Sequence, residues 1–143
     1  MVSGDALISI KPWYAEAILS GEKTVELRRR IPKIAIGCRL WIYATLPIGA
    51  VVGSAVVERI ETASPDAIWR DYSEAMALNR VEFDSYLEGS SAAIALKLAK
   101  VVKRRHTNIN QLRSLRAGFH PPQVLSRLSN QEMVKLSEMA IAL

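Results

Sequence analysis

Apolar and polar residues alternate near the start of the chain. From Ala6 to Lys11 every second residue is alanine or isoleucine, a period of two that predicts a strand with one buried face. Pro12 follows and suits the first turn of a helix, because its missing N–H would have no partner there. The helical pattern runs to about Ser20, and Gly21 fits the position just after a helix end. The pattern therefore predicts a strand followed directly by a helix.

Four further stretches predict the rest of a sheet. They are rich in β-branched, aromatic and other apolar residues and are bounded by turn residues. Gly53 lies inside the third of them and is a candidate bulge. The four stretches are Thr24–Arg30, Leu40–Thr45, Ala50–Ile60 and Ala92–Val102.

Helix start signals predict four more helices. Two lie between the apolar stretches and begin at Ser64, which is followed by a proline, and at Asn79. A short helix is predicted over Asn110–Leu115. Ser129 and the glutamate three residues later form a capping-box pattern, which predicts a C-terminal helix over residues 130–143.

This order of elements indicates an α+β protein with a core built largely from strands. A small curled sheet or barrel is the economical arrangement, because it removes exposed strand edges. With 143 residues and neither repeats nor a linker, the chain predicts a single domain over residues 1–143.

Cysteine and the N-terminus predict the cellular setting. Cys38 is alone, so no intrachain disulfide can form and a reducing compartment is expected. Neither it nor the two histidines show a metal-ligand spacing, so we predict no metal site and no cofactor. Residues 1–5 carry no leader pattern and no apolar run is long enough for a membrane span, which predicts a soluble, cytoplasmic protein.

Charge is distributed unevenly along the chain. The sequence has 19 lysines and arginines against 14 acidic residues, a net charge of +5. Glu58–Glu88 holds eight acidic and three basic residues, so the rest of the chain has a net charge of +10. The basic residues gather in Lys23–Arg39 and Lys97–Arg116. These segments form either one strongly positive surface suited to a polyanion or two separate solvated faces, and charge alone favours neither.

The densest polar cluster follows the first predicted helix. Four of its residues would share one face of a strand: Thr24, Glu26, Arg28 and Arg30. Such a line can bind an anion while the carboxylate acts as acceptor or base; a strand edge guarded by charge is the alternative. Lys23 falls on the opposite face by strict alternation, or it lies in the preceding turn and can point either way.

Two segments carry a resemblance to a known family. Leu7–Pro12 is an apolar strand that ends in Lys-Pro, and Ile18–Arg28 contains Gly-x-Lys-Thr-x-Glu-x-Arg. This opening resembles that of an ASCH domain, and the similarity extends over about residues 6–127. Later pieces of the family have similar counterparts at Trp41–Ala44, Val52–Val57 and Phe119–Gln123.

The resemblance implies a small PUA-like mixed β-barrel with peripheral helices and a cleft. The family is thought to bind RNA, and some members are linked to RNA cleavage or to deacylation of a modified cytidine nucleoside. By this resemblance Lys23, Glu26 and Arg28 line the cleft, with Ser9 and Lys11 nearby. Deacylating members carry a threonine where this sequence has Glu26, which argues against that activity here. A carboxylate beside Lys23 would also keep the amine charged.

Other residues are candidates to complete the cleft. Tyr43 can stack on a base or belong to the core, and Trp13, near the first helix, offers the same two alternatives. Glu58 and Glu74 are carboxylates that can approach the cleft from the strand side or the helix side.

A second basic run predicts a nucleic-acid surface. Lys103, Arg104 and Arg105 leave a strand and enter a loop, and Arg113 and Arg116 follow further along the chain. They can track phosphates, in which case binding would weaken steeply with salt. A run that only promotes solubility is an equal alternative.

Three hypotheses follow. The leading one is an RNA- or nucleotide-binding module with a basic cleft and a regulatory role in RNA metabolism. The second is an enzyme, a ribonuclease or modified-nucleoside hydrolase with Lys23 and Glu26 as catalytic groups and Arg28 stabilising an anion. The third is a regulatory subunit that binds a protein partner through the acidic segment Ser64–Gly89. Oligomeric state is left open.

Overall fold

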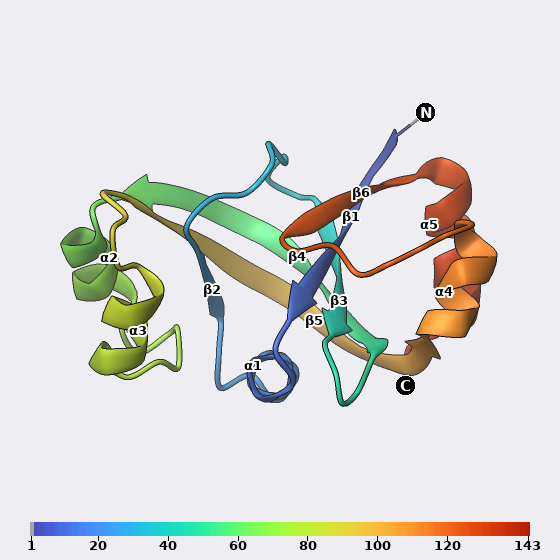
Figure 1. The fold of residues 1–143 in the computed structure, drawn as a ribbon, viewed down its shortest axis with the longest axis horizontal. Helices are drawn as coiled ribbons and strands as arrows, with labels where there is room; N and C mark the ends of the chain where they lie inside the picture. The colour runs from blue at the N-terminus through green and yellow to red at the C-terminus, as the bar shows by residue number, and fades with distance from the viewer. Residues whose placement is uncertain (1) are drawn as a thin grey trace.

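A six-stranded mixed sheet forms the centre of the computed structural model, which describes residues 2–143 (Figure 1). The strand order is β2-β5-β4-β3-β1-β6. β1 and β3 run parallel, and every other neighbouring pair is antiparallel. The strands are β1 (Val2–Ile10), β2 (Val25–Arg28), β3 (Arg39–Ala44), β4 (Ala50–Ala63), β5 (Ala93–Asn108) and β6 (Leu125–Ser129).

The mixed α+β class is confirmed, but the closed barrel is not observed. β2 and β6 are the two edges of the sheet over residues 2–143. β2 pairs with the first part of β5 alone, through residues Val25–Arg28. Its gap to β1 is spanned by a side chain, because Arg28 donates to the carbonyl oxygen of Ser9 over 2.7 Å. The sheet therefore curls while leaving space between β2 and β1.

The predicted bulge at Gly53 is confirmed. The register between β4 and β5 shifts between Val51 and Gly53. A Cβ atom at position 53 would lie 2.7 Å from the carbonyl oxygen of Val102 and would also meet the side chain of Leu19. Glycine is needed here because the neighbouring backbone approaches so closely.

Five helices surround the sheet (Figure 1). The predicted caps are confirmed: the side chains of Ser64, Asn79 and Ser129 each accept a hydrogen bond from the backbone of the following turn. Asn108 forms a further capping box. The helices are α1 (Pro12–Ser20), α2 (Pro65–Tyr72), α3 (Arg80–Tyr86), α4 (Ile109–Leu115) and α5 (Asn130–Met139).

The predicted C-terminal helix over residues 130–143 is too long. α5 ends at Met139, and the last residues run beside β5 instead. There the backbone N–H of Arg105 donates to the carbonyl oxygen of Ile141, and the backbone N–H of Leu143 donates to the carbonyl oxygen of Lys103. The sequence prediction also missed β6, which is short and has mixed polarity.

The prediction of one buried face for β1 is wrong, because both faces are covered. Ala6, Ile8 and Ile10 pack with α1 in one core, whereas Leu7 packs with α4 and α5 in a second. Ser9, on the same side as Leu7, is also buried. A third core joins β2 and the start of β5 to α2 and α3. No helix within residues 2–143 is long and apolar enough to cross a bilayer.

Candidate ligand-binding pocket

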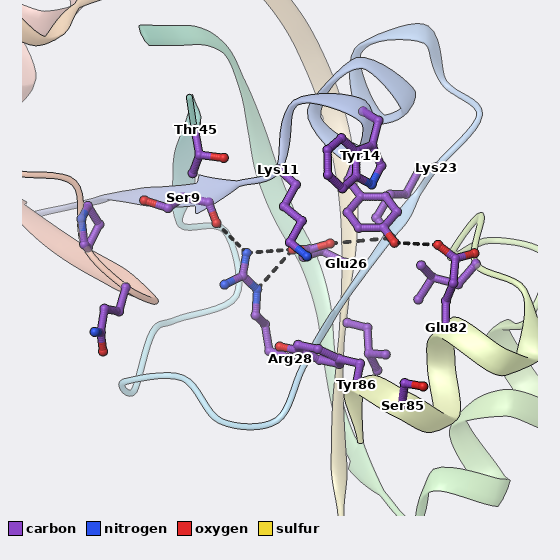
Figure 2. A pocket seen from close by; sticks show the side chains of 15 residues that line it. Ser9, Lys11, Tyr14, Lys23, Glu26, Arg28, Thr45, Glu82, Ser85 and Tyr86 are labelled. Carbon is purple, nitrogen blue, oxygen red and sulfur yellow. Dashed lines mark hydrogen bonds and ion pairs between the residues drawn. The ribbon is translucent and has the colours of Figure 1, made fainter. Parts of the chain in front are cut away.

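A pocket of about 850 Å³ lies where β1, β2, α1 and α3 meet (Figure 2). The strands contribute polar groups to its floor, α1 follows directly from β1, and α3 supplies the facing wall. The segment before β6 completes the lining. The lining residues are Ser9, Lys11, Trp13, Tyr14, Lys23, Glu26, Leu27, Arg28, Thr45, Leu78, Glu82, Ser85, Tyr86, Pro122 and Gln123.

Two buried cations flank one buried carboxylate in this pocket. Arg28 donates through Nε and Nη2 to Oε2 of Glu26, over 3.0 and 2.7 Å. Lys23 Nζ lies 3.5 Å from the other carboxylate oxygen, Oε1. The Lys23 side chain is 1% exposed, that of Glu26 is 8% exposed and that of Arg28 is 10% exposed. Three charged groups this deeply buried need one another, because each would be strongly destabilised alone.

Lys23 lies in the turn between α1 and β2, which resolves the open alternative about its direction. Its backbone N–H donates to the carbonyl oxygen of Ala17, and Nζ donates to that of Met76 over 2.6 Å. Nζ also lies 5.1 Å from the ring centre of Tyr14. The turn therefore directs the ammonium to the same side as Glu26.

Burial lowers the pKa of Lys23, and this outweighs the neighbouring Glu26 carboxylate, which acts in the opposite direction. The expectation that Glu26 keeps the amine charged is wrong, because the cost of desolvating the amine is larger than the effect of this carboxylate. A lysine that loses its proton more readily than usual inside a pocket is typical of a functional site.

We expect the free energy of unfolding to rise with pH in the alkaline range because of Lys23. Its pKa in the folded protein lies below the ordinary value of 10.5, so between the two values the unfolded chain binds more protons. The contribution of this group to stability therefore increases as pH rises towards 10.5. In urea unfolding from neutral pH upwards, the free energy of unfolding should rise more steeply with pH for the wild type than for Lys23→Met. Identical slopes in the two proteins would contradict the argument.

A hydrogen bond between α1 and α3 crosses the mouth of the pocket. Tyr14 donates through its hydroxyl to Oε2 of Glu82 over 2.9 Å (Figure 2). Burial, and then this bond, raise the pKa of Tyr14. The backbone N–H of Asn79, and then Tyr14, lower the pKa of Glu82. Glu82 thus uses one oxygen for the capping box of α3 and the other for the pocket.

Two aromatic side chains lie partly exposed at the pocket. Trp13, on α1, is 58% exposed, and Tyr86, at the end of α3, is 39% exposed. Lys11 Nζ lies 5.6 Å from the ring centre of Trp13, and the guanidinium of Arg29 lies 5.4 Å from that of Tyr86. Each ring is therefore partly accessible and has a cation nearby, and aromatic rings and cations are the two kinds of group that bind single-stranded nucleic acids.

The structure brings together five of the eight predicted ligand-binding residues: Ser9, Lys11, Lys23, Glu26 and Arg28. Thr24 and Arg30 are exposed and do not line the pocket. Tyr43 is 3% exposed and packs in the second core with α4 and α5, which favours the core alternative for this residue over base stacking.

Besides Glu26, one further acidic residue reaches the pocket, and it is neither Glu58 nor Glu74. Glu58 lies 4.0 Å from Lys97 on the outside of β4, and Glu74 does not line the pocket. Glu82 takes this place. The capping-box pattern at Asn79 was visible in the sequence, but its partner Tyr14 lies 68 residues away and gave no local signal.

The second basic run is only partly a free surface. Lys103, Arg105 and Arg113 are exposed. Arg104 donates to Ser54 Oγ over 2.8 Å and to the carbonyl oxygen of Ala140 over 2.9 Å. Arg116 forms an ion pair with Glu132 and also donates to Ser126 Oγ and the carbonyl oxygen of Arg127. Both guanidiniums hold the C-terminal part of the fold together, and a role for them as phosphate contacts stays a prediction.

This surface also lies apart from the pocket. The start of β5 pairs with β2, whereas Lys103 and Arg105 pair with the last residues of the chain at the other end of that long strand (Figure 1). The two basic segments meet where Val25 pairs with Lys97, but Lys103 and Arg105 lie at the far end of β5, away from the pocket. Within residues 2–143, no three His, Cys, Asp or Glu side chains are grouped so as to hold a metal ion.

Comparison with known proteins places the chain in a family. Residues 8–116 match the family described as a domain of unknown function, DUF365. A protein of Zymomonas mobilis named ASCH domain-containing ribonuclease is 42% identical over 132 residues, which cover 92% of this chain and 89% of that protein. This chain belongs to the ASCH domain family.

Solved structures share the fold of this chain. The crystal structure of ASCH from Zymomonas mobilis matches with a TM-score of 0.94 at 40% identity, over 96% of both chains. The N-terminal domain of Staphylothermus marinus McrB matches with a TM-score of 0.63 at 10% identity, over 96% of this chain and 95% of that domain. At that identity the second likeness concerns the fold alone.

Proposed function

We propose that this ASCH domain binds RNA or a nucleotide in the pocket between β1, β2, α1 and α3. The observation that carries the proposal is that one pocket of about 850 Å³ combines two partly exposed aromatic rings with three cationic side chains. Stacking faces and positive charges are the two features that single-stranded nucleic acids and nucleotides require.

Each group has a role in this proposal. Trp13 and Tyr86 stack on bases, while Lys11, at the mouth, neutralises phosphate. Glu26 and Glu82 are hydrogen-bond acceptors suited to the amino groups of bases. The Zymomonas relative is named a ribonuclease, and its similarity over most of both chains supports an RNA-related function for this domain.

A salt titration of single-stranded RNA binding tests the proposal. We expect Lys11→Gln to weaken binding and to reduce the slope of log K against log salt by about 0.7, the value for one phosphate contact on a single strand. Lys135→Gln, at an exposed position on α5, is the matched control and should bind as the wild type does. If wild-type protein binds neither RNA nor nucleotides at low salt, the proposal fails.

Hydrolysis of RNA or of a modified nucleoside is the second candidate. The observation that favours it is the position of Lys23 in the pocket, with Nζ 3.5 Å from Glu26 Oε1, where burial lowers the pKa of the amine towards that of a base. Against it, both oxygens of Glu26 already face cations. Glu26→Gln should abolish turnover and leave binding intact if Glu26 is catalytic.

A protein partner for the acidic segment Ser64–Gly89 stays a prediction. α3, within this segment, forms a wall of the pocket, so its outer surface is the part left for a partner. A partner that binds equally well to wild type and to Lys11→Gln, but not to a variant of the exposed Val81, would support this alternative.

A further inference from the structure

One end of the pocket gathers polar groups at the carboxyl ends of two parallel strands. β1 and β3 run side by side as far as the Ile10–Ala44 pair, and Thr45 then donates its backbone N–H to Ile10. Ser9, Lys11 and Thr45 line the pocket here, as does Gln123 from the segment before β6.

Ser9 has a buried hydroxyl that no protein group satisfies. The residue is 9% exposed, and Oγ has no hydrogen-bond partner among the described residues. Figure 2 shows the side chain of Ser9 directed away from Glu26, while its carbonyl oxygen accepts from Arg28. A buried hydroxyl without a partner is destabilising, so its presence in a pocket lining points to a ligand.

Arg28, which donates to the carbonyl oxygen of Ser9, also lines the pocket and has unused donors. Its Nε and Nη2 are bound to Glu26 and Ser9, but no hydrogen bond to Nη1 is found within residues 2–143. Figure 2 shows this third nitrogen pointing to the side of the pocket away from Glu26. The guanidinium is fixed in place by its other two nitrogens, so the two remaining N–H groups are held ready for an acceptor.

The charges at this end favour an anion. Lys11 and Arg28 contribute two cations, and Ser9, Thr45 and Gln123 contribute neutral donors. The two acidic residues of the pocket are oriented elsewhere: Glu26 faces Arg28 and Lys23, and Glu82 lies on α3 against Tyr14. An acceptor-rich, negatively charged group is therefore the complementary ligand.

We propose that Ser9 Oγ, Arg28 Nη1 and Lys11 Nζ form a subsite for a phosphoryl group at this end of the pocket. The subsite rests on the proposed function, in which the phosphoryl group belongs to a nucleotide or to an RNA phosphodiester while the base lies towards Trp13 and Tyr86. It adds a direction to that binding mode, from the phosphate at β1 to the base at α1 and α3.

Ser9→Ala tests the subsite without disturbing the fold. Because the hydroxyl has no protein partner, its removal should leave the Tm unchanged or raise it. The same change should weaken the binding of nucleoside 5′-monophosphates by about tenfold, because a hydrogen bond to a charged group is lost. The binding of nucleosides should not change. Calorimetric titrations with inorganic phosphate, the four monophosphates, the four nucleosides and a short RNA measure this.

Thr107→Val is the matched control, because Thr107 Oγ1 is also buried without a partner but lies outside the pocket. Its Tm should respond as in Ser9→Ala while ligand binding stays at the wild-type level. Lys11→Gln repeats the binding test at an exposed position, without changing a buried residue. It should weaken the binding of the monophosphates as well.

The outcomes separate the subsite from the proposed function. Inorganic phosphate that binds wild type but not Ser9→Ala, with no binding of nucleosides or RNA, would support the subsite and overturn the RNA function. Monophosphates and RNA that bind the wild type and Ser9→Ala equally, or monophosphates that bind no better than nucleosides, would overturn the subsite and leave the RNA function standing.

Discussion

Replacing Glu26 with alanine is expected to lower the free energy of unfolding by about 3–5 kcal/mol, the cost of leaving a buried charge without its partner. Here two cations would lose the same carboxylate, since Glu26 lies 2.7 Å from Arg28 Nη2 and 3.5 Å from Lys23 Nζ. Urea unfolding at neutral pH measures the loss. The deficit should shrink as pH rises, because the pKa of Lys23 is already lowered by burial and the amine can shed its proton.

Two variants control for this result. Glu26→Gln keeps an oxygen that can accept a hydrogen bond from Arg28, so it should lower the free energy of unfolding clearly less than Glu26→Ala does. Glu88→Ala removes an exposed carboxylate and should have almost no effect. If Glu26→Ala is as stable as Glu88→Ala, the three charges are not interdependent and the electrostatic account of the pocket floor is wrong.

Removal of the two exposed aromatic rings should abolish most RNA binding. Base stacking on an aromatic side chain contributes about 1–3 kcal/mol per base, so Trp13→Ala and Tyr86→Ala should each weaken binding by roughly five- to 150-fold. The double variant should lose more than either single one. Fluorescence anisotropy with a labelled single-stranded oligonucleotide measures these affinities at one fixed salt concentration.

Val81→Ala is the matched control for the aromatic variants. Val81 lies on α3, is 74% exposed and does not line the pocket, so its loss should leave affinity unchanged. Because Trp13 and Tyr86 are also exposed, the variants should keep the wild-type Tm to within a few degrees. Unchanged RNA affinity in the double variant would place any RNA away from this pocket and direct attention to Lys103 and Arg105.

These predictions differ from those that the sequence alone would suggest. The basic cleft predicted from the sequence suggests a test by replacing Lys23 and Arg28. Both side chains, however, are buried and hydrogen-bonded to the backbone. Loss of binding in such variants would report unfolding as readily as lost contacts. The exposed residues Lys11, Trp13 and Tyr86 give a cleaner test.

Local signals in the sequence determined much of the fold and the centre of the candidate site. Caps at Ser64, Asn79 and Ser129 fix helix starts through contacts within one turn, so they are readable without the fold. Strand alternation placed Glu26 and Arg28 on one face but left the direction of Lys23 open, and only the resemblance to an ASCH domain grouped all three residues before the structure did.

Contacts between distant segments were decided by the tertiary structure alone. The Tyr14–Glu82 bond, the internal pairing of Arg104 and Arg116, and the burial of Tyr43 all depend on packing across long sequence separations. The same holds for the open sheet edge between β2 and β1, where a side chain from Arg28 takes the place of strand pairing. A sequence pattern records which residues are apolar, charged or turn-forming, but which groups become desolvated and which keep free donors is set by neighbours that only the folded chain supplies.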